Sequence, residues 1–278
     1  MKTIKNRHAF TMLELIFVIV VLGIVASIGS ELIAKVYENY IVQRAQHRAS
    51  IKTQLAINQI ANRLRYAIPD TIVRRVDKTG TVESFSQDMG GNEDDYTVLQ
   101  WVAYDGDSFE AINSDDSSGV ARRPGWSGFC DLNASTSTTI STPASNFTLT
   151  NAIQGNLGGS GTFAIYFPND PIVAHYGTGA GEVITLGTAV SRISERYKLA
   201  WTSYALVVEG GDLYLYYDFP PSYGATIETA GFKKSLLLKS VVNFKYKGRG
   251  QTSRIKLCVE EQIGNSETIP SCKEKAVF

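Results

Sequence analysis

Residues 9–26 read AFTMLELIFVIVVLGIVA, and this stretch decides the fold. The run from Phe10 to Gly29 is apolar apart from Glu14 and a few small polar residues. About 20 such residues, at about 1.5 Å of helical rise each, cross a hydrocarbon core of about 30 Å. The segment before the run has no acidic residue and carries the basic residues Lys2, Lys5 and Arg7. Because basic flanks stay in the cytoplasm, we expect one membrane span, with the chain exported after about Ser30.

Glu14 is the unusual residue of this span. A carboxylate inside a membrane segment costs about 2.5–3.5 kcal/mol, and such residues are usually kept for pairing, although a position near the interface also reduces the cost. If a peptidase cuts between Ala9 and Phe10, the new α-amino group lies one helical turn before Glu14. Each chain then carries a positive α-amino group and the negative Glu14 carboxylate at matching depth in the membrane.

Together, these residues make the run 9–26 resemble the prepilin-type cleavage and methylation motif of type IV pilins and type II secretion pseudopilins. The resemblance implies cleavage after Ala9, N-methylation of Phe10 by the prepilin peptidase, and pairing of Glu14 with a neighbouring subunit's N-terminus. The sequence departs from the usual pattern of this family at Ala9, where glycine is usual. The resemblance further implies a non-enzymatic filament subunit, held in the inner membrane with a periplasmic head. The implied partners are other pilins, the prepilin peptidase, inner-membrane lipid and the assembly platform.

An ordinary secretory signal is the alternative interpretation of the same segment, because it also combines basic, apolar and small residues. Cleavage would then fall near residues 26–29, and the helix that follows would lose its anchor. A carboxylate within the apolar zone disfavours this alternative. The first residue of the mature protein distinguishes the two cases.

The chain has no proline between Met1 and Pro69, so one helix is predicted over residues 10–68. Its expected parts, after a leader at 1–9, are a transmembrane segment at 10–30 and a periplasmic amphipathic segment at 31–68. Two apolar stripes with helical spacing follow the span: Ile33, Val36, Tyr37, Tyr40 and Ile41, and then Ile57, Ile60, Ala61, Leu64 and Ile68. We expect the second stripe to dock on the sheet of the same chain.

Residues 69–278 change to period-two, aromatic-rich runs that predict a β-rich head. The candidate strands are 96–104, 162–167, 182–186, 199–209, 213–219, 236–247 and 254–260. Residues 209–212, EGGD, form a strong hairpin turn, because glycine adopts positive φ without steric cost. The predicted class is α+β, a long helix packed on an antiparallel sheet, which also resembles the pilin fold.

Residues 133–151 are rich in serine and threonine, and we expect a surface loop or insertion there. Within this region, the stretch from Asp131 to Ser135 resembles the extended acidic sequon of some bacterial N-glycosylation systems, which makes Asn133 a possible glycan acceptor. Chance matches are common in polar loops, so solvated polar side chains are the competing explanation.

Three cysteines in an exported chain suggest an oxidising compartment. Cys258 and Cys272 have 13 residues between them, and closing such a loop contributes about 3 kcal/mol. A disulfide between these two resembles the C-terminal loop of many type IV pilins. Two alternatives stay open: a buried free thiol at Cys258, and a bond from Cys130 to either of the other cysteines.

The charge pattern offers little for other chemistry. Lys+Arg and Asp+Glu both number 27, so no net field attracts nucleic acid. The acidic runs 93–95 and 115–116 lack EF-hand spacing, which disfavours calcium. Two basic pairs (Arg122-Arg123 and Lys233-Lys234) are a weak indication of DNA contact. We expect no cofactor and no metal, because the histidines and cysteines show no metal-ligand spacing.

Size favours a minor subunit over a major one. Cleavage would remove nine of the 278 residues and leave 269, and a large head is harder to pack at every position of a helical filament. The alternative is a filament-tip adhesin or ligand-binding module that uses exposed aromatic residues (Trp126, Tyr216, Tyr217 and Tyr223). The motif serves pili, secretion pseudopili and DNA-uptake machines alike.

Overall fold

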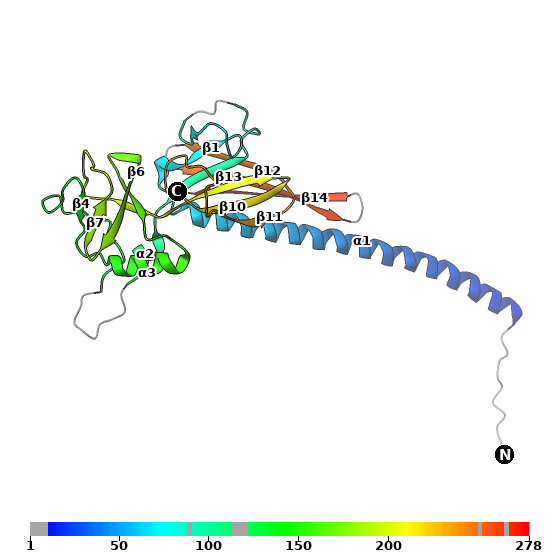
Figure 1. Ribbon diagram of the computed structural model, residues 1–278. Coiled ribbons are helices and arrows are strands. Elements are labelled where there is room, and N and C mark those ends of the chain that lie inside the picture. The colour runs from blue at the N-terminus through cyan, green and yellow to red at the C-terminus, as the bar shows by residue number, and fades with distance from the viewer. Residues whose placement is uncertain (1–10, 88–90, 113–121, 250–251, 264–266, 278) are drawn as a thin grey trace, which may run out of the picture.

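The computed structural model describes residues 11–87, 91–112, 122–249, 252–263 and 267–277. One long helix leads into a β-rich head, and Figure 1 shows the N-terminal half of this helix extending far beyond the head. The predicted α+β class, a long helix packed on antiparallel sheet, is confirmed.

Helix α1 spans Met12–Leu64, 53 residues, and is about 80 Å long at about 1.5 Å per residue. Its most apolar stretch is not buried by any described residue, and it is the one helix in this part of the chain long and apolar enough to cross a membrane. The helix ends four residues before the predicted end at Ile68, which adopts extended backbone angles. Pro69 explains the early end, because a proline disfavours the helical conformation of the residue before it.

The second half of α1 docks on the head. Its buried residues repeat at helical spacing: Ala45, Ala49, Thr53, Ala56, Ile57, Ile60, Ala61 and Leu64. Four of these are alanines, which let the adjacent strands approach closely. The second predicted stripe is therefore confirmed as the docking face, whereas the first stripe is exposed along its length.

We call residues 65–103 and 202–277 the basal head. Its larger sheet has the antiparallel order β11-β10-β9-β3-β1-β2. The strands are β1 Val73–Arg75, β2 Glu83–Ser84, β3 Val98–Ala103, β9 Thr202–Glu209, β10 Asp212–Phe219 and β11 Lys233–Leu238. A 3-10 turn at Pro69–Thr71 leads from α1 into this sheet. Positive φ at Gly210 and Gly211 forms the predicted hairpin turn between β9 and β10.

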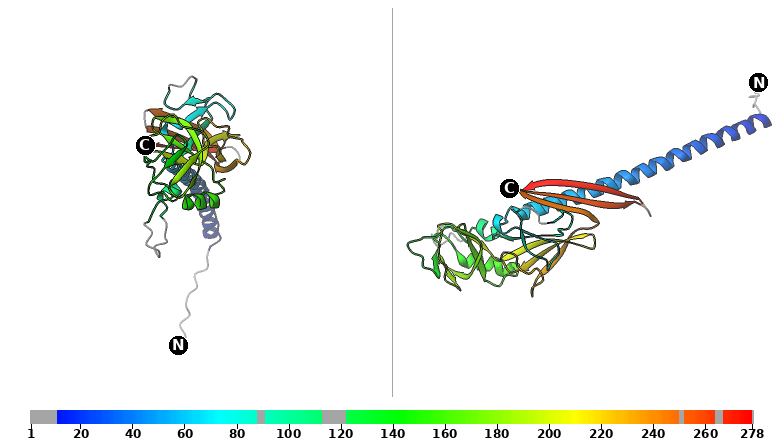
Figure 2. Two further views of the ribbon diagram at one scale, coloured as in Figure 1. Left: turned by 60° about the vertical axis from the view of Figure 1, so that its left-hand side comes forward. Right: turned by 90° about the horizontal axis from the view of Figure 1, so that it is seen from above.

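A second, three-stranded sheet in the basal head runs along α1. It consists of β12 Val241–Arg249, β13 Thr252–Ile263 and β14 Glu267–Val277, in that order. The right-hand view of Figure 2 shows the β13–β14 hairpin lying lengthwise against the helix. One hydrophobic core joins α1 to both sheets, with Ile60 from the helix, Trp101 and Leu206 from the larger sheet, and Leu257 from β13.

Residues 104–201 form a separate unit, which we call the inserted lobe. Its sheet has the order β4-β7-β6-β5-β8 and its own core around Phe147, Phe163 and Leu199. The elements are α2 Gly106–Glu110, β4 Thr139–Ser141, α3 Phe147–Leu157, β5 Phe163–Phe167, β6 Asp170–Ala180, β7 Val183–Leu186 and β8 Lys198–Ala200. Figure 1 shows this lobe beyond the C-terminal end of α1, opposite the uncovered half of the helix.

The lobe is inserted between two adjacent strands of the basal head. Ala103 at the end of β3 pairs with Thr202 at the start of β9, so the chain leaves and returns at one point of the sheet. A small buried cluster joins the two units: Ile68, Val102, Ala164, Tyr166 and Ala200. Tyr166 also donates a hydrogen bond of 2.6 Å to the carbonyl of Pro221. The lobe is therefore packed on the basal head.

Three sequence predictions are wrong in detail. The strand predicted over 199–209 is divided at Trp201 between β8 and β9, which belong to different sheets. The loop predicted at 133–151 contains β4 and the start of α3, and both Ile140 and Phe147 are fully buried. Some of its polar groups are paired within the lobe: Thr142 donates to the carbonyl of Glu182, and Asn146 caps α3. The strand predicted over 236–247 is divided between β11 and β12, because Ser240 adopts a left-handed φ of 56°.

The docking face makes a prediction about stability. Replacing Ile60, which is 1% exposed, by alanine leaves a cavity between α1 and the sheets, and we expect a loss of about 2–5 kcal/mol in the free energy of unfolding. Urea unfolding of the full chain in detergent, followed by near-ultraviolet circular dichroism, measures this loss. Leu55→Ala on the same helix is the control, since Leu55 is 58% exposed and should change stability by about 0.5 kcal/mol or less. Equal losses for the two variants would contradict the docking arrangement.

Candidate functional site

The first turn of α1 carries a reciprocal cap between Thr11 and Glu14. The Thr11 hydroxyl oxygen accepts the backbone N–H of Glu14 at 3.3 Å, and the Glu14 carboxylate accepts the backbone N–H of Thr11 at 3.0 Å. The carboxylate also accepts the Thr11 hydroxyl at 3.1 Å. This capping box satisfies N–H groups that a helix start leaves without partners. The sequence analysis missed it, although the T-x-x-E pattern at 11–14 is its known signature.

The cap fixes where the charge lies. The Glu14 carboxylate is turned back toward the start of the helix, beside the backbone N–H of Thr11. Ala9 and Phe10, the residues predicted for cleavage and methylation, lie outside the described residues. Around the carboxylate the helix surface is apolar and uncovered, from Met12 at 82% exposure to Val21 at 42%. The Glu14 carboxylate is therefore held at one end of a long apolar surface that no other described residue covers.

A comparison with known protein families identifies this segment. Residues 4–30 match the model described as the prokaryotic N-terminal methylation motif. This motif at the start of the chain is the one that type IV pilins and pseudopilins share. No curated protein and no solved structure matches the chain.

The matched motif supports a subunit of the pilin or pseudopilin kind, processed by the prepilin peptidase. The apolar half of α1 fits membrane anchoring followed by incorporation into a filament. The helix packed on antiparallel sheet is the pilin-like arrangement.

The cysteines of the chain are divided between its two units. Cys258 and Cys272 are cross-strand neighbours on β13 and β14 and form a disulfide, so the hairpin that lies on α1 is covalently closed. Cys130 is a free thiol in the core of the inserted lobe. Burial raises the pKa of the Cys130 thiol to about 12, which keeps it protonated and unreactive.

The other predicted binding residues lie apart from the helix start. Asn133 is exposed, and the flanking Asp131 and Ser135 hydrogen-bond within the turn, so its use as a glycan acceptor stays a prediction. Asp94 and Glu93 form ion pairs with Lys245 and Lys247, and no group of three potential metal ligands occurs among the described residues. Residues 115–116 lie outside the described part of the chain.

The basic pairs and surface aromatics predicted for ligand contact are mostly engaged within the fold. Arg123 pairs with Glu182, and Lys233 and Lys234 pair with Asp218 and Glu209. Two of the four aromatic candidates are buried: Trp126 is 2% exposed and donates its indole N–H to the carbonyl of Asp105, and Tyr216 is fully buried. Tyr217 and Tyr223 are half-buried.

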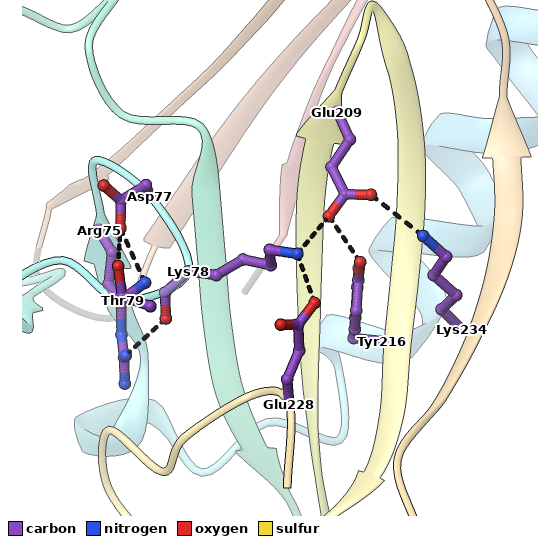
Figure 3. A network of polar contacts seen from close by, with 8 residues as sticks. All are labelled: Arg75, Asp77, Lys78, Thr79, Glu209, Tyr216, Glu228 and Lys234. Atoms are coloured by element: carbon purple, nitrogen blue, oxygen red, sulfur yellow. Dashed lines mark hydrogen bonds and ion pairs between the residues drawn. The ribbon is translucent and has the colours of Figure 1, made fainter.

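A network of charges that the sequence did not indicate crosses the outer face of the basal head (Figure 3). Glu209 at the end of β9 accepts hydrogen bonds from Tyr216 at 2.6 Å, Lys78 at 3.0 Å and Lys234 at 3.2 Å. Lys78 also pairs with Glu228. Burial alone would raise the pKa of Glu209, but these hydrogen bonds outweigh it and lower the pKa to about 2. The network connects β9, β10 and β11 to the loop after β1, which is a structural role.

This shift predicts a pH dependence of stability. The folded-state pKa of Glu209 lies below its ordinary value of 4.5, so the ionised carboxylate stabilises the fold above pH 4.5. The stabilisation is lost as the pH falls from about 4.5 to about 2. Melting temperatures measured across this range should fall less steeply for Glu209→Gln than for the natural chain. Glu274→Gln, which removes an exposed ion pair with Arg254, should leave the slope unchanged, and the same slope for all three chains would contradict the assignment.

Proposed function

We propose that this chain is a minor pilin or minor pseudopilin of a type IV pilus or type II secretion filament. It is cleaved between Ala9 and Phe10, methylated on Phe10, and held in the inner membrane with its head in the periplasm before assembly. The observation that carries the proposal is the position of the inserted lobe. This unit of 104–201 adds bulk beyond the C-terminal end of α1 (Figure 1).

A helical filament uses one head-to-tail contact at every position. Each repeating subunit must therefore present the same pair of complementary surfaces, one to the subunit above and one to the subunit below. In a filament built on parallel α1 helices, the inserted lobe projects along the helix direction toward the next subunit. The lobe is packed on the basal head through Val102 and Tyr166, so it does not simply move aside. A chain with this extra unit fits best where few neighbours follow, which supports low copy number near one filament end.

Assembly itself rests on Glu14. Surrounded by lipid or by other apolar helices, its carboxylate has no water to solvate it. An ion pair with a neighbouring subunit's N-terminal amine would offset this desolvation cost. The capping box supports this role, because it holds the carboxylate at the helix start, at the depth where such an amine would lie.

The two roles of Glu14 can be separated by substitution. Glu14→Gln keeps an oxygen acceptor for the cap but removes the charge, and we expect incorporation into filaments to fall about tenfold or more, with the same fall for Glu14→Ala. Immunoblots of sheared filaments against membranes, at equal expression, measure incorporation. Thr11→Ala is the matched control: it removes the cap at a cost of about 1 kcal/mol but keeps the charge, so it should assemble far better. Normal assembly of Glu14→Gln would reject charge pairing.

The minor role can be tested by removing the inserted lobe. Residues 104–201 are replaced by Asn-Gly, which can join Ala103 to Thr202 as a two-residue hairpin turn because these residues are already paired. The deletion exposes Ile68 and Val102, so both are replaced by threonine to make the new surface polar. Quantitative mass spectrometry of purified filaments should find the full chain as a small fraction and the shortened chain several-fold more abundant. Formation of the Cys258–Cys272 disulfide verifies its fold.

The full chain as the bulk component of purified filaments would reject the minor role. An unchanged copy number for a correctly folded, shortened chain would show that the inserted lobe does not limit incorporation.

A further inference from the structure

A groove runs along the junction between the inserted lobe, the end of α1 and strand β9. It consists of two adjoining cavities of about 360 and 340 Å³, which share the lining residues Arg63, Asp107, Trp201 and Tyr204. Each cavity is within the range of about 300–1,000 Å³ typical of ligand sites, which often lie between two units of a fold. The groove is near the C-terminal end of α1, far from the apolar half of the helix.

Aromatic rings form much of this groove. Tyr204 stacks on the buried Trp101 at 5.9 Å between ring centroids, and the Arg63 guanidinium lies 5.5 Å from its ring. Tyr66 and Tyr104 pack together at 5.3 Å at one end. The rings of Trp201 and Tyr204 are half-buried, so each is held firmly by the fold while part of it faces solvent. Such rings are preorganised platforms for an apolar surface.

Two of the rings in the groove have polar tips without a hydrogen-bond partner in the described residues, whereas Tyr66 donates to Glu110. Outside the groove, Tyr166 and Tyr246 each donate a 2.6 Å hydrogen bond to a backbone carbonyl. Inside it, neither the hydroxyl of Tyr204 nor the indole N–H of Trp201 has a hydrogen-bond partner among the residues that the structure describes. The groove therefore offers donors beside its apolar platforms.

The charges of the groove disfavour polyanions. Asp107 is exposed and forms no ion pair within the described ranges. Asp218 also lines the groove but is neutralised by Lys233 at 2.7 Å, and the buried Asp105 caps helix α2. Arg63 is the one cation among the described residues that line the groove, so the carboxylates of Asp105 and Asp107 leave an excess of one negative charge. A nucleic acid or an acidic polysaccharide would be repelled by this excess.

We propose that this groove binds a neutral oligosaccharide. A pyranose ring has apolar C–H faces that pack on aromatic rings and a rim of hydroxyls that both donate and accept. The rim matches the mixed donors and acceptors of Trp201, Tyr204, Asp107 and the neighbouring amide of Asn62. A proline-rich peptide suits aromatic grooves as well, but prolines have no N–H and would desolvate Asp107 without replacing its hydrogen bonds. The inference goes beyond filament assembly and does not depend on it.

The test uses the full chain in micelles of a detergent without a sugar headgroup, which would otherwise compete. Isothermal titration calorimetry measures binding of three neutral hexasaccharides, cellohexaose, maltohexaose and chitohexaose, and of three comparison ligands, oligogalacturonate, oligothymidylate and oligoproline. We expect at least one neutral hexasaccharide to bind and the two anionic ligands not to bind. The measurement needs no filament, so its outcome is separate from that of the assembly experiments.

Two conservative variants then place the site. Tyr204→Phe removes only a hydroxyl, and Asp107→Asn removes only a charge from an exposed side chain. Each should raise the dissociation constant about fivefold, the loss expected of one hydrogen bond. Tyr176→Phe on β6 is the matched control, because Tyr176 is 39% exposed outside the groove and should bind as the natural chain does. The proposal is overturned if no neutral hexasaccharide binds, if an anionic ligand or oligoproline binds more tightly, or if Tyr204→Phe and Asp107→Asn bind like the control.

Discussion

The uncovered apolar half of α1 is the constraint on which the rest of the structure depends. Its side chains are exposed from end to end, and no segment of the described chain lies near enough to cover them. In water this surface would cost about 25 cal/mol for every Å² of apolar area. Only lipid or the apolar helices of other subunits remove that cost, and a helix suits both because its backbone hydrogen bonds are satisfied internally. One surface therefore fits both a membrane anchor and a filament core.

The second half of the same helix is covered by the sheets of its own chain. Small residues such as Ala49 and Ala56 bring β13 and β14 close, while Ile57 and Ile60 fill the core between the sheets. The ion pair from Lys52 to Glu261 marks the edge of this docked region. Because one helix runs without a break from Met12 to Leu64, it fixes the position of the head relative to the helix start at Met12.

The sequence predicted the parts of this structure that depend on local pattern. The apolar run, the second stripe and the turn at Gly210 and Gly211 follow from periodicity and backbone preference. Strand β14 was missed because its sequence, ETIPSCKEKAV, contains a proline and several charges, and it is a strand only through its register with β13. The inserted lobe and the groove were missed for a related reason. The pairing of Ala103 with Thr202, and the meeting of Arg63 with Trp201, join residues far apart in the chain.

The docking of α1 on β13 and β14 also sets an order of events during synthesis. The hydrogen bond between Lys52 and Glu261 spans 209 residues, so the inner face of the helix is made long before the strands that cover it. Until those strands are made, the inner face of the helix has nothing to pack against. Closure of the basal core therefore requires synthesis through β14, and a chain terminated before that strand would leave Ile57 and Ile60 without the packing that covers them.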